Sequence, residues 1–242
     1  HKRNAMNGEV VGGIMQVFSA IEDSRDIRAV VLRGADGHFC SGGDISGMQE
    51  TPSQEEAERL AWEFNRVFGR MCTQVNRAPQ VVITCLEGAV LGGGFGLACV
   101  SDIAISRDNA QFGLPETGLG VLPAQIAPFV VKRIGLTQAR RLALLGSRFN
   151  GETAQKLGVI HEVVRDDIEL EQLLADTIQQ IKRAAPLASR NTKALLHRTL
   201  NEPLDSLLDA AAQQFAQAVG GAEGQEGTMA FIQKRLPNWT EQ

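Results

Sequence analysis

The sequence has 242 residues, of which 43% are hydrophobic and 21% charged, and its formal net charge is −4. This length is enough for one substantial hydrophobic core, so we expect a globular, enzyme-sized domain with a helical appendage. The negative balance argues against general attraction to nucleic acid or to an anionic membrane. No apolar segment is long enough to span a bilayer, and we expect no signal peptide.

The cysteines lack the spacing of a metal site or of a redox motif. Cys40, Cys72, Cys85 and Cys99 form no CxxC pair, and the chain is neither small nor loop-rich. We therefore interpret them as reduced, mostly buried thiols of a cytoplasmic protein, and we expect no metal site. The sequence begins with His1 rather than Met, which leaves open what precedes it.

The first half of the chain alternates between helical and strand patterns. Apolar residues recur at helical spacing from Met6 to Ile21, and Ser53 with Glu56 forms a capping box ahead of a second apolar stripe. Short apolar runs between these helices indicate strands over 29–32, 81–85 and 103–106. Such alternation predicts an α/β domain.

Beyond Pro123 the pattern becomes mainly helical. Glycine and proline interrupt the helical periodicity at several points, and a short apolar run over 159–164 predicts one more strand. The helices are expected over 138–145, 153–157, 168–184, 187–200 and 204–219. We interpret 220–227, rich in Gly and Glu, as a linker before a last segment that ends at Pro237.

The stretch from 87 to 102 carries the main functional signal. An apolar strand leads into three consecutive glycines, 92–94, and then into a helical segment, and a second glycine-rich turn follows the preceding strand at 39–44. Glycine lets the backbone approach a ligand closely, and the free N–H groups of a first helical turn favour developing negative charge. Close packing or phosphate binding would use the same residues, but the arrangement also suits an oxyanion hole.

Several motifs together resemble the enoyl-CoA hydratase/isomerase (crotonase) superfamily in order and spacing. They are Phe-Cys-Ser-Gly-Gly-Asp-Ile at 39–45, the glycine stretch 88–98 with Asp102, Phe-Gly-Leu-Pro-Glu at 112–116, and Lys-Arg-Leu-Pro-Asn-Trp at 234–239. The resemblance covers essentially the whole chain. It implies an α/β fold, a ClpP-like spiral of ββα units in two roughly perpendicular sheets with a C-terminal helical region, and a homotrimer or a hexamer of two trimers.

On this basis we divide the chain into a spiral core, 1–185, and a helical trimerisation and lid region, 186–242. The resemblance implies that the N–H groups of Gly43 and Gly93 form the oxyanion hole, and that Glu116 is the general acid/base. The resemblance also implies an acyl-CoA thioester as substrate, so coenzyme A would belong to the substrate and no separate cofactor is implied. Further positions expected to contact the substrate are Cys40, Ser41, Gly42, Asp44, Ile45, Gly92 and Gly96.

Two departures from the family pattern narrow the expected substrate. Hydratases of straight-chain enoyl-CoA carry a second glutamate where this chain has Gly96, and a glycine-rich stretch where it has Pro-Ala-Gln-Ile-Ala-Pro-Phe at 123–129. Both features resemble bacterial hydratases of 3-methylglutaconyl-CoA and isohexenylglutaconyl-CoA, whose acyl groups are branched and carboxylated. We therefore expect a hydratase of such a substrate, with Gly96 leaving room near the β-carbon.

Two other functions stay open. A Δ3,Δ2-enoyl-CoA isomerase needs only one carboxylate to carry a proton between two substrate carbons, so it also suits the loss of the second glutamate. A catalytically idle member that binds CoA thioesters or RNA is the alternative from another class. The C-terminal helices do carry a basic stretch, although a solvated helix face or a CoA phosphate contact explains it more simply. Its residues are Lys182, Arg183, Arg190, Lys193, His197 and Arg198.

Overall fold

A parallel sheet forms the centre of the molecule. The computed structural model describes residues 2–44 and 53–240. The strands of this sheet follow the order β1-β2-β4-β7, and each neighbouring pair is parallel, with Ala29 of β1 opposite Val81 of β2. Their bounds are β1 (Ala29–Arg33), β2 (Val81–Leu86), β4 (Ile103–Arg107) and β7 (Glu162–Val164).

A smaller sheet lies beside the larger one and carries the loops of interest. Its order is β3-β5-β6, with β3 parallel to β5 and β5 antiparallel to β6. Sequence patterns missed all of its strands, because two or three residues are too few to show an alternating period. Their bounds are β3 (Ala89–Leu91), β5 (Gln111–Gly113) and β6 (Arg148–Phe149).

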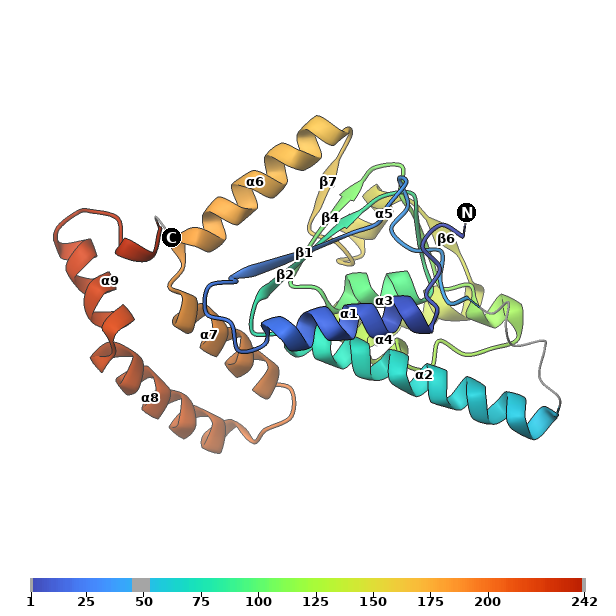
Figure 1. The fold of residues 1–242 in the computed structure, drawn as a ribbon, viewed down its shortest axis with the longest axis horizontal. Coiled ribbons are helices and arrows are strands. Elements are labelled where there is room, and N and C mark those ends of the chain that lie inside the picture. Colours follow the sequence, from blue (N-terminus) through green and yellow to red (C-terminus); the bar gives the residue numbers. More distant parts are fainter. Residues whose placement is uncertain (1, 45–52, 241–242) are drawn as a thin grey trace.

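Helices cover the larger sheet, and several begin with side-chain caps, of which the one at Ser53 was expected from the sequence. Asn7, Ser53 and Asn150 each accept a hydrogen bond from the backbone N–H three residues later. The helices of this part are α1 (Gly8–Ile21), α2 (Gln54–Arg77), α3 (Gly93–Val100), α4 (Ala127–Leu145) and α5 (Gly151–Lys156) (Figure 1).

The two faces of the larger sheet pack against different helices. In β2, Val82 and Leu86 point into the main core, whereas Ile83 and Cys85 point into a second cluster on the opposite face. That second cluster includes Leu170 of α6 (Asp167–Arg183). The alternation explains why 81–85 reads as a continuous apolar run: both of its faces are buried.

The C-terminal helices form an arm that extends away from the sheets (Figure 1). After α6, the arm consists of α7 (Pro186–Arg198), α8 (Leu204–Gly220) and α9 (Ala222–Ile232). α8 and α9 each bury few residues, and large apolar side chains of α8 are exposed at helical spacing on one face. These exposed residues are Leu204, Leu208, Phe215 and Val219.

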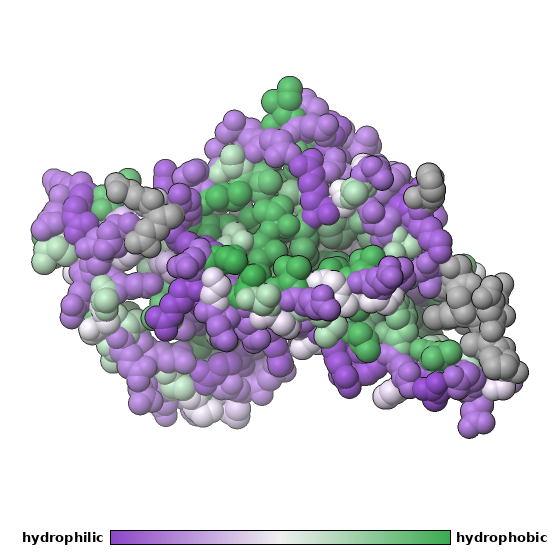
Figure 2. Space-filling model, in the orientation of Figure 1, coloured by the Kyte–Doolittle hydropathy of each residue, from purple (hydrophilic) through white to green (hydrophobic). Residues whose placement is uncertain are grey.

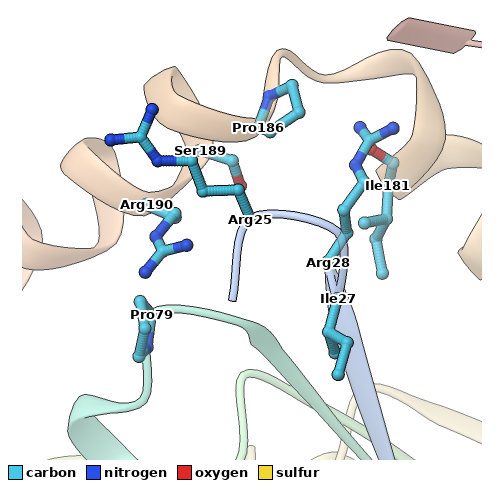
Figure 3. A pocket seen from close by; sticks show the side chains of 8 residues that line it. All are labelled: Arg25, Ile27, Arg28, Pro79, Ile181, Pro186, Ser189 and Arg190. Carbon is cyan, nitrogen blue, oxygen red and sulfur yellow. The ribbon is translucent and has the colours of Figure 1, made fainter. Parts of the chain in front are cut away.

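Basic side chains attach this arm to the core. Arg28 donates hydrogen bonds to the carbonyls of Ile181, Ala184 and Trp239, and Arg190 donates to the carbonyls of Glu22 and Ser24. These arginines border a small cavity of about 10 Å³ at the junction (Figure 3). It is lined by Arg25, Ile27, Arg28, Pro79, Ile181, Pro186, Ser189 and Arg190.

A partly buried ion pair completes the attachment. Lys193 of α7 lies 2.6 Å from Asp102 and 2.9 Å from the carbonyl of Gln80, and Asp102 also accepts the N–H of Val82. Members of the basic stretch therefore hold the arm against the sheet. The ion pair connects α7 to Asp102, which lies between α3 and β4. The further hydrogen bonds of both side chains offset the cost of taking their charges out of water.

Two expectations about the second half of the chain were incomplete or wrong. α4 is broken at Gly135 (φ +74°, ψ 159°): the helix expected over 138–145 follows this break, and the helical segment from Ala127 that precedes it was missed. The expected linker 220–227 is mostly helical and belongs to the end of α8 and the start of α9. Its glycines serve close packing: an added Cβ would lie 2.1 Å from the carbonyl oxygen of Ala218 at Gly224, and 3.0 Å from the ring of Trp239 at Gly227.

The surface shows one apolar region on the face that contains β1. Figure 2 shows apolar residues gathered at the centre of this face, between α6 and α1, with hydrophilic residues around them. β1 is the edge strand of its sheet, and Val31 within it is exposed. None of the described helices is long and apolar enough to cross a membrane.

Candidate active site

The turn that contains residues 40–44 is held between β3 and the N-terminal segment. Cys40 donates its N–H to the carbonyl of Ala89 (2.8 Å) and accepts the N–H of Leu91 (2.9 Å). On the other side, Met6 donates to the carbonyl of Gly42 and accepts the N–H of Asp44, both at 2.8 Å. Residues 40–44 therefore run alongside β3 and the glycines that follow it.

This pairing leaves selected N–H groups without an acceptor. Gly42 donates its N–H to the sulfur of Cys40 (3.3 Å), and Gly92 donates to the carbonyl of Gly113 (3.0 Å). The N–H groups of Gly43 and Gly93 donate to no acceptor among the described residues. Gly43 is exposed and Gly93 partly exposed, whereas Gly42 and Gly92 are buried. The backbone thus offers two accessible donors on adjacent turns.

Glu116 lies against the same turn. Gly92 precedes the first residue of α3 with φ +49°, a conformation that favours glycine. A Cβ placed on Gly92 would lie 3.0 Å from Oε1 of Glu116 and 3.6 Å from Cα of Gly42. The two glycine turns and this carboxylate therefore meet at one point, although they are far apart in the sequence.

The loop after β5 fixes the position of Glu116. Glu116 is the first residue of a short 3-10 helix, η2 (Glu116–Leu119). The backbone carbonyl of Glu116 accepts the N–H groups of Gly120 and Val121. Thr117 anchors the same loop to α4 through a 2.8 Å hydrogen bond from its hydroxyl to the carbonyl of Ala143. The carboxylate is consequently carried by a segment that is held at both ends.

The environment of Glu116 favours its protonated form more than water does. Burial raises the pKa of this carboxyl, and a hydrogen bond from its own backbone N–H opposes the shift. Its Oε2 atom is buried and has no hydrogen-bond partner within the described part of the chain. A carboxyl group with a raised pKa and an unused oxygen is suited to exchanging a proton with a bound molecule.

The remaining predicted residues of the 39–45 motif serve the turn in different ways. Cys40 is 1% exposed, and burial raises the pKa of its thiol, so its side chain lies beneath the turn and not in a groove. Ser41 donates its hydroxyl to the carbonyl of Lys2, and Asp44 forms an ion pair with Lys2 at 2.6 Å. Ile45 lies outside the described residues.

Gly96 does not provide the open space that the sequence suggested. A Cβ at Gly96 would lie 2.3 Å from Cγ2 and 3.0 Å from Cβ of Ile126, so the side chain of Ile126 already occupies this volume. The two departures from the family pattern, at Gly96 and in the 123–129 segment, are therefore one packing arrangement. Our expectation that Gly96 leaves room for a branched acyl group is corrected accordingly.

Sequence reasoning also missed the apolar residues that lie against α3. A Cβ at Gly93 would lie 2.9 Å from the ring of Phe68 and 3.6 Å from the sulfur of Met6. Phe95, inside α3, packs edge-on against Phe112 and Phe149, with ring centroids 6.3 and 6.1 Å apart. No local signal could have identified these contacts, because each residue comes from a different element.

The histidine next to the site holds a loop, and it is not part of a cluster of metal ligands in the described ranges. Among residues 2–44 and 53–240, no group of three or more His, Cys, Asp or Glu side chains is arranged to hold a metal ion. The nearby His38 uses its Nδ1 atom to accept the N–H of Ala89 at 3.1 Å. Its ring is thereby engaged in holding the loop next to β3.

The packing at Gly96 predicts the effect of adding one methyl group. Gly96→Ala should lower the free energy of unfolding by about 1–3 kcal/mol, because the new Cβ overlaps the stiff, buried side chain of Ile126. Gly13→Ala in α1 is the matched control, since nothing lies within 4 Å of its added Cβ, and it should leave stability equal or up to about 1 kcal/mol higher. Denaturant unfolding measures both, and equal effects would contradict the packing.

Comparisons with known proteins identify the family of this chain. The family model described as enoyl-CoA hydratase/isomerase matches residues 1–242. Among curated proteins, the chain is 30% identical to the short-chain-enoyl-CoA hydratase of Clostridium acetobutylicum over 234 residues, which is 96% of this chain and 87% of that protein.

Solved structures show the same relationship more strongly. AtuE of Pseudomonas aeruginosa is 56% identical with a TM-score of 0.93, and the match covers 98% of this chain and 92% of that one. An enoyl-CoA hydratase/isomerase from Marinobacter aquaeolei is 53% identical with a TM-score of 0.94, covering 99% and 92%. The expected α/β crotonase fold with parallel strands and C-terminal helices is confirmed, and the chain belongs to the enoyl-CoA hydratase/isomerase family.

Proposed function

We propose that the protein is an enoyl-CoA hydratase that adds water to the double bond of a branched, glutaconyl-type acyl-CoA. The observation that carries this proposal is that Glu116 lies beside Gly92, next to the N–H groups of Gly43 and Gly93, which have no acceptor in the described ranges. The similarity to a short-chain-enoyl-CoA hydratase supports the reaction type. Coenzyme A enters and leaves as part of the substrate.

The proposed reaction uses Glu116 twice. Its carboxylate takes a proton from water as the water oxygen forms a bond to Cβ, and the electrons of the double bond move to the thioester oxygen. The N–H groups of Gly43 and Gly93 stabilise the resulting enolate oxygen, and donors of this kind are worth about 3 kcal/mol each. Glu116 then returns the proton to Cα, so one water is added and the carboxylate is restored.

The branched substrate is supported by the chemistry next to Glu116. Hydratases of straight-chain enoyl-CoA carry a second glutamate at the position of Gly96. In this chain the apolar side chain of Ile126 packs against Gly96 instead. An apolar wall suits an alkyl branch on the β-carbon better than a second water-activating group. The combination of Gly96 with the 123–129 segment also resembles hydratases of 3-methylglutaconyl-CoA and isohexenylglutaconyl-CoA.

The alternatives are weaker but distinct. An isomerase would use the same oxyanion hole and the single carboxylate, so substrate assays must separate it from a hydratase. The RNA-binding alternative loses much of its basis, because Arg190 and Lys193 are engaged with the core and Arg198 with Glu202. The four cysteines are buried free thiols, which supports a cytoplasmic location.

We also propose that the chain assembles as a homotrimer or as a hexamer of two trimers. The exposed apolar face of α8 supports this assembly, since exposed faces of this kind usually mark contacts with another chain. Light scattering coupled to size-exclusion chromatography should give three or six times the chain mass of 26.1 kDa. A stable monomer at micromolar concentration would contradict the proposal.

A substrate panel tests the reaction directly. The protein should be incubated with crotonyl-CoA, 3-methylglutaconyl-CoA and isohexenylglutaconyl-CoA, and the products analysed by mass spectrometry. We expect a gain of one water, with kcat/KM higher for the branched thioesters. A shifted double bond without a gain in mass would favour the isomerase, and no conversion of any thioester would refute both.

Replacing the candidate acid/base should remove chemistry but not binding. Glu116→Gln keeps the size of the side chain, and we expect kcat to fall by about 10²-fold or more while thioester affinity changes little. Glu162→Gln, at an exposed position of β7, is the matched control and should retain full turnover. If both variants turn over equally, Glu116 is not the proton-exchanging group.

The raised pKa of Glu116 also predicts a pH-dependent stability difference. The folded protein holds this proton to higher pH than the unfolded chain does, so ionisation lowers stability as pH rises above about 4, the ordinary range for glutamate. The Glu116→Gln variant has no carboxyl group to ionise at this position. Its free energy of unfolding relative to the wild type should therefore rise between pH 4 and neutral pH. Urea unfolding midpoints of both proteins across that pH range measure the difference in stability. A difference that does not change with pH would contradict a raised pKa caused by burial of Glu116.

A further inference from the structure

Gly96 and Ile126 have complementary shapes. Gly96 lies inside α3, and Ile126 immediately precedes α4 and is 3% exposed. The distances of 2.3 and 3.0 Å from a Cβ at position 96 to the Cγ2 and Cβ atoms of Ile126 leave no room for any side chain there. Ile126 therefore replaces the side chain that α3 lacks at this point.

Three hydrogen bonds hold the backbone of Ile126 at the start of α4. Its N–H donates to the carbonyl of Pro123 at 3.2 Å, and its carbonyl accepts the N–H groups of Phe129 and Val130 at 3.0 Å each. A β-branched side chain also has little rotational freedom at χ1. Ile126 thus presents a fixed apolar surface against the first turns of α3.

This surface lies one helical turn from the candidate carboxylate. Gly96 donates its N–H to the carbonyl of Gly92 at 3.0 Å, and Oε1 of Glu116 lies 3.0 Å from the Cβ position of that same Gly92. Gly92 is the non-helical residue that precedes α3, so this hydrogen bond closes the first turn of the helix, with Glu116 against its beginning and Ile126 against Gly96 at its end. An acyl chain whose β-carbon reaches Glu116 then has Ile126 among the apolar groups that lie against this turn.

We infer that Ile126 is a specificity-determining residue that packs against the β-substituent of a branched acyl group. This inference rests on the proposed function, because it takes Glu116 as the group that acts at the substrate. A branch on Cβ would contact Ile126, whereas a straight chain has no atom at that place. Contact with one methyl group corresponds to about a fourfold gain in affinity.

Two saturated thioesters test the inference without any reaction. Butyryl-CoA and isovaleryl-CoA differ by one methyl group on Cβ, and neither has a double bond to hydrate. In Ile126→Ala, isovaleryl-CoA should lose about fourfold in affinity relative to butyryl-CoA, measured by titration calorimetry. Ile83→Ala is the matched control: it removes the same atoms from the buried cluster beneath α6, and the affinity ratio should not change.

A milder variant guards against loss of folding. Ile126→Val removes a single carbon, and it should move the affinity ratio in the same direction by a smaller amount. A ratio that stays unchanged in the folded variants, a ratio that moves toward isovaleryl-CoA, or no binding of either thioester to the wild type overturns the inference. Failure of the proposed function would be seen in a different experiment, in which the wild type hydrates no enoyl-CoA. The binding of the saturated thioesters would still test the role of Ile126 in that case.

Discussion

The two hydrogen bonds between Cys40 and β3 determine the geometry of the candidate site. They fix residue 40 beside residue 90, so the two glycine turns that follow run next to each other. Met6 holds the opposite side of the first turn and leaves the N–H of Gly43 facing away from it. The direction of a backbone N–H donor depends on such backbone hydrogen bonds, because it cannot be changed by rotating a side chain.

Each glycine around α3 meets a different physical requirement. Gly92 adopts a positive φ and allows the carboxylate of Glu116 to approach, whereas Gly94 gives way to Cys40, 2.7 Å from its Cβ position. Gly96 accommodates Ile126 in the same manner. The start of α3 is therefore enclosed by side chains from elsewhere in the fold, and the N–H of the partly exposed Gly93 has no acceptor among the described residues.

The unpaired polar groups of this region carry a cost for stability. Within the described residues, the buried Oε2 atom of Glu116 has no hydrogen-bond partner, and such an atom would be satisfied in a region selected only for stability. The surrounding structure tolerates them because aromatic packing of Phe95 against Phe112 and Phe149 holds α3 firmly to the smaller sheet. Unpaired groups on such a rigid support are typical of functional sites.

The sequence by itself determined the α/β class, most helices and the motifs that resemble the family, because capping residues, helical periods and glycine turns are local signals. It missed the strands of the smaller sheet and the true role of 220–227. Only the tertiary structure brought Glu116 to Gly92 and placed Ile126 in the space at Gly96. These contacts join segments of the chain that have no local pattern in common, so their positions depend on how the sheets and helices pack.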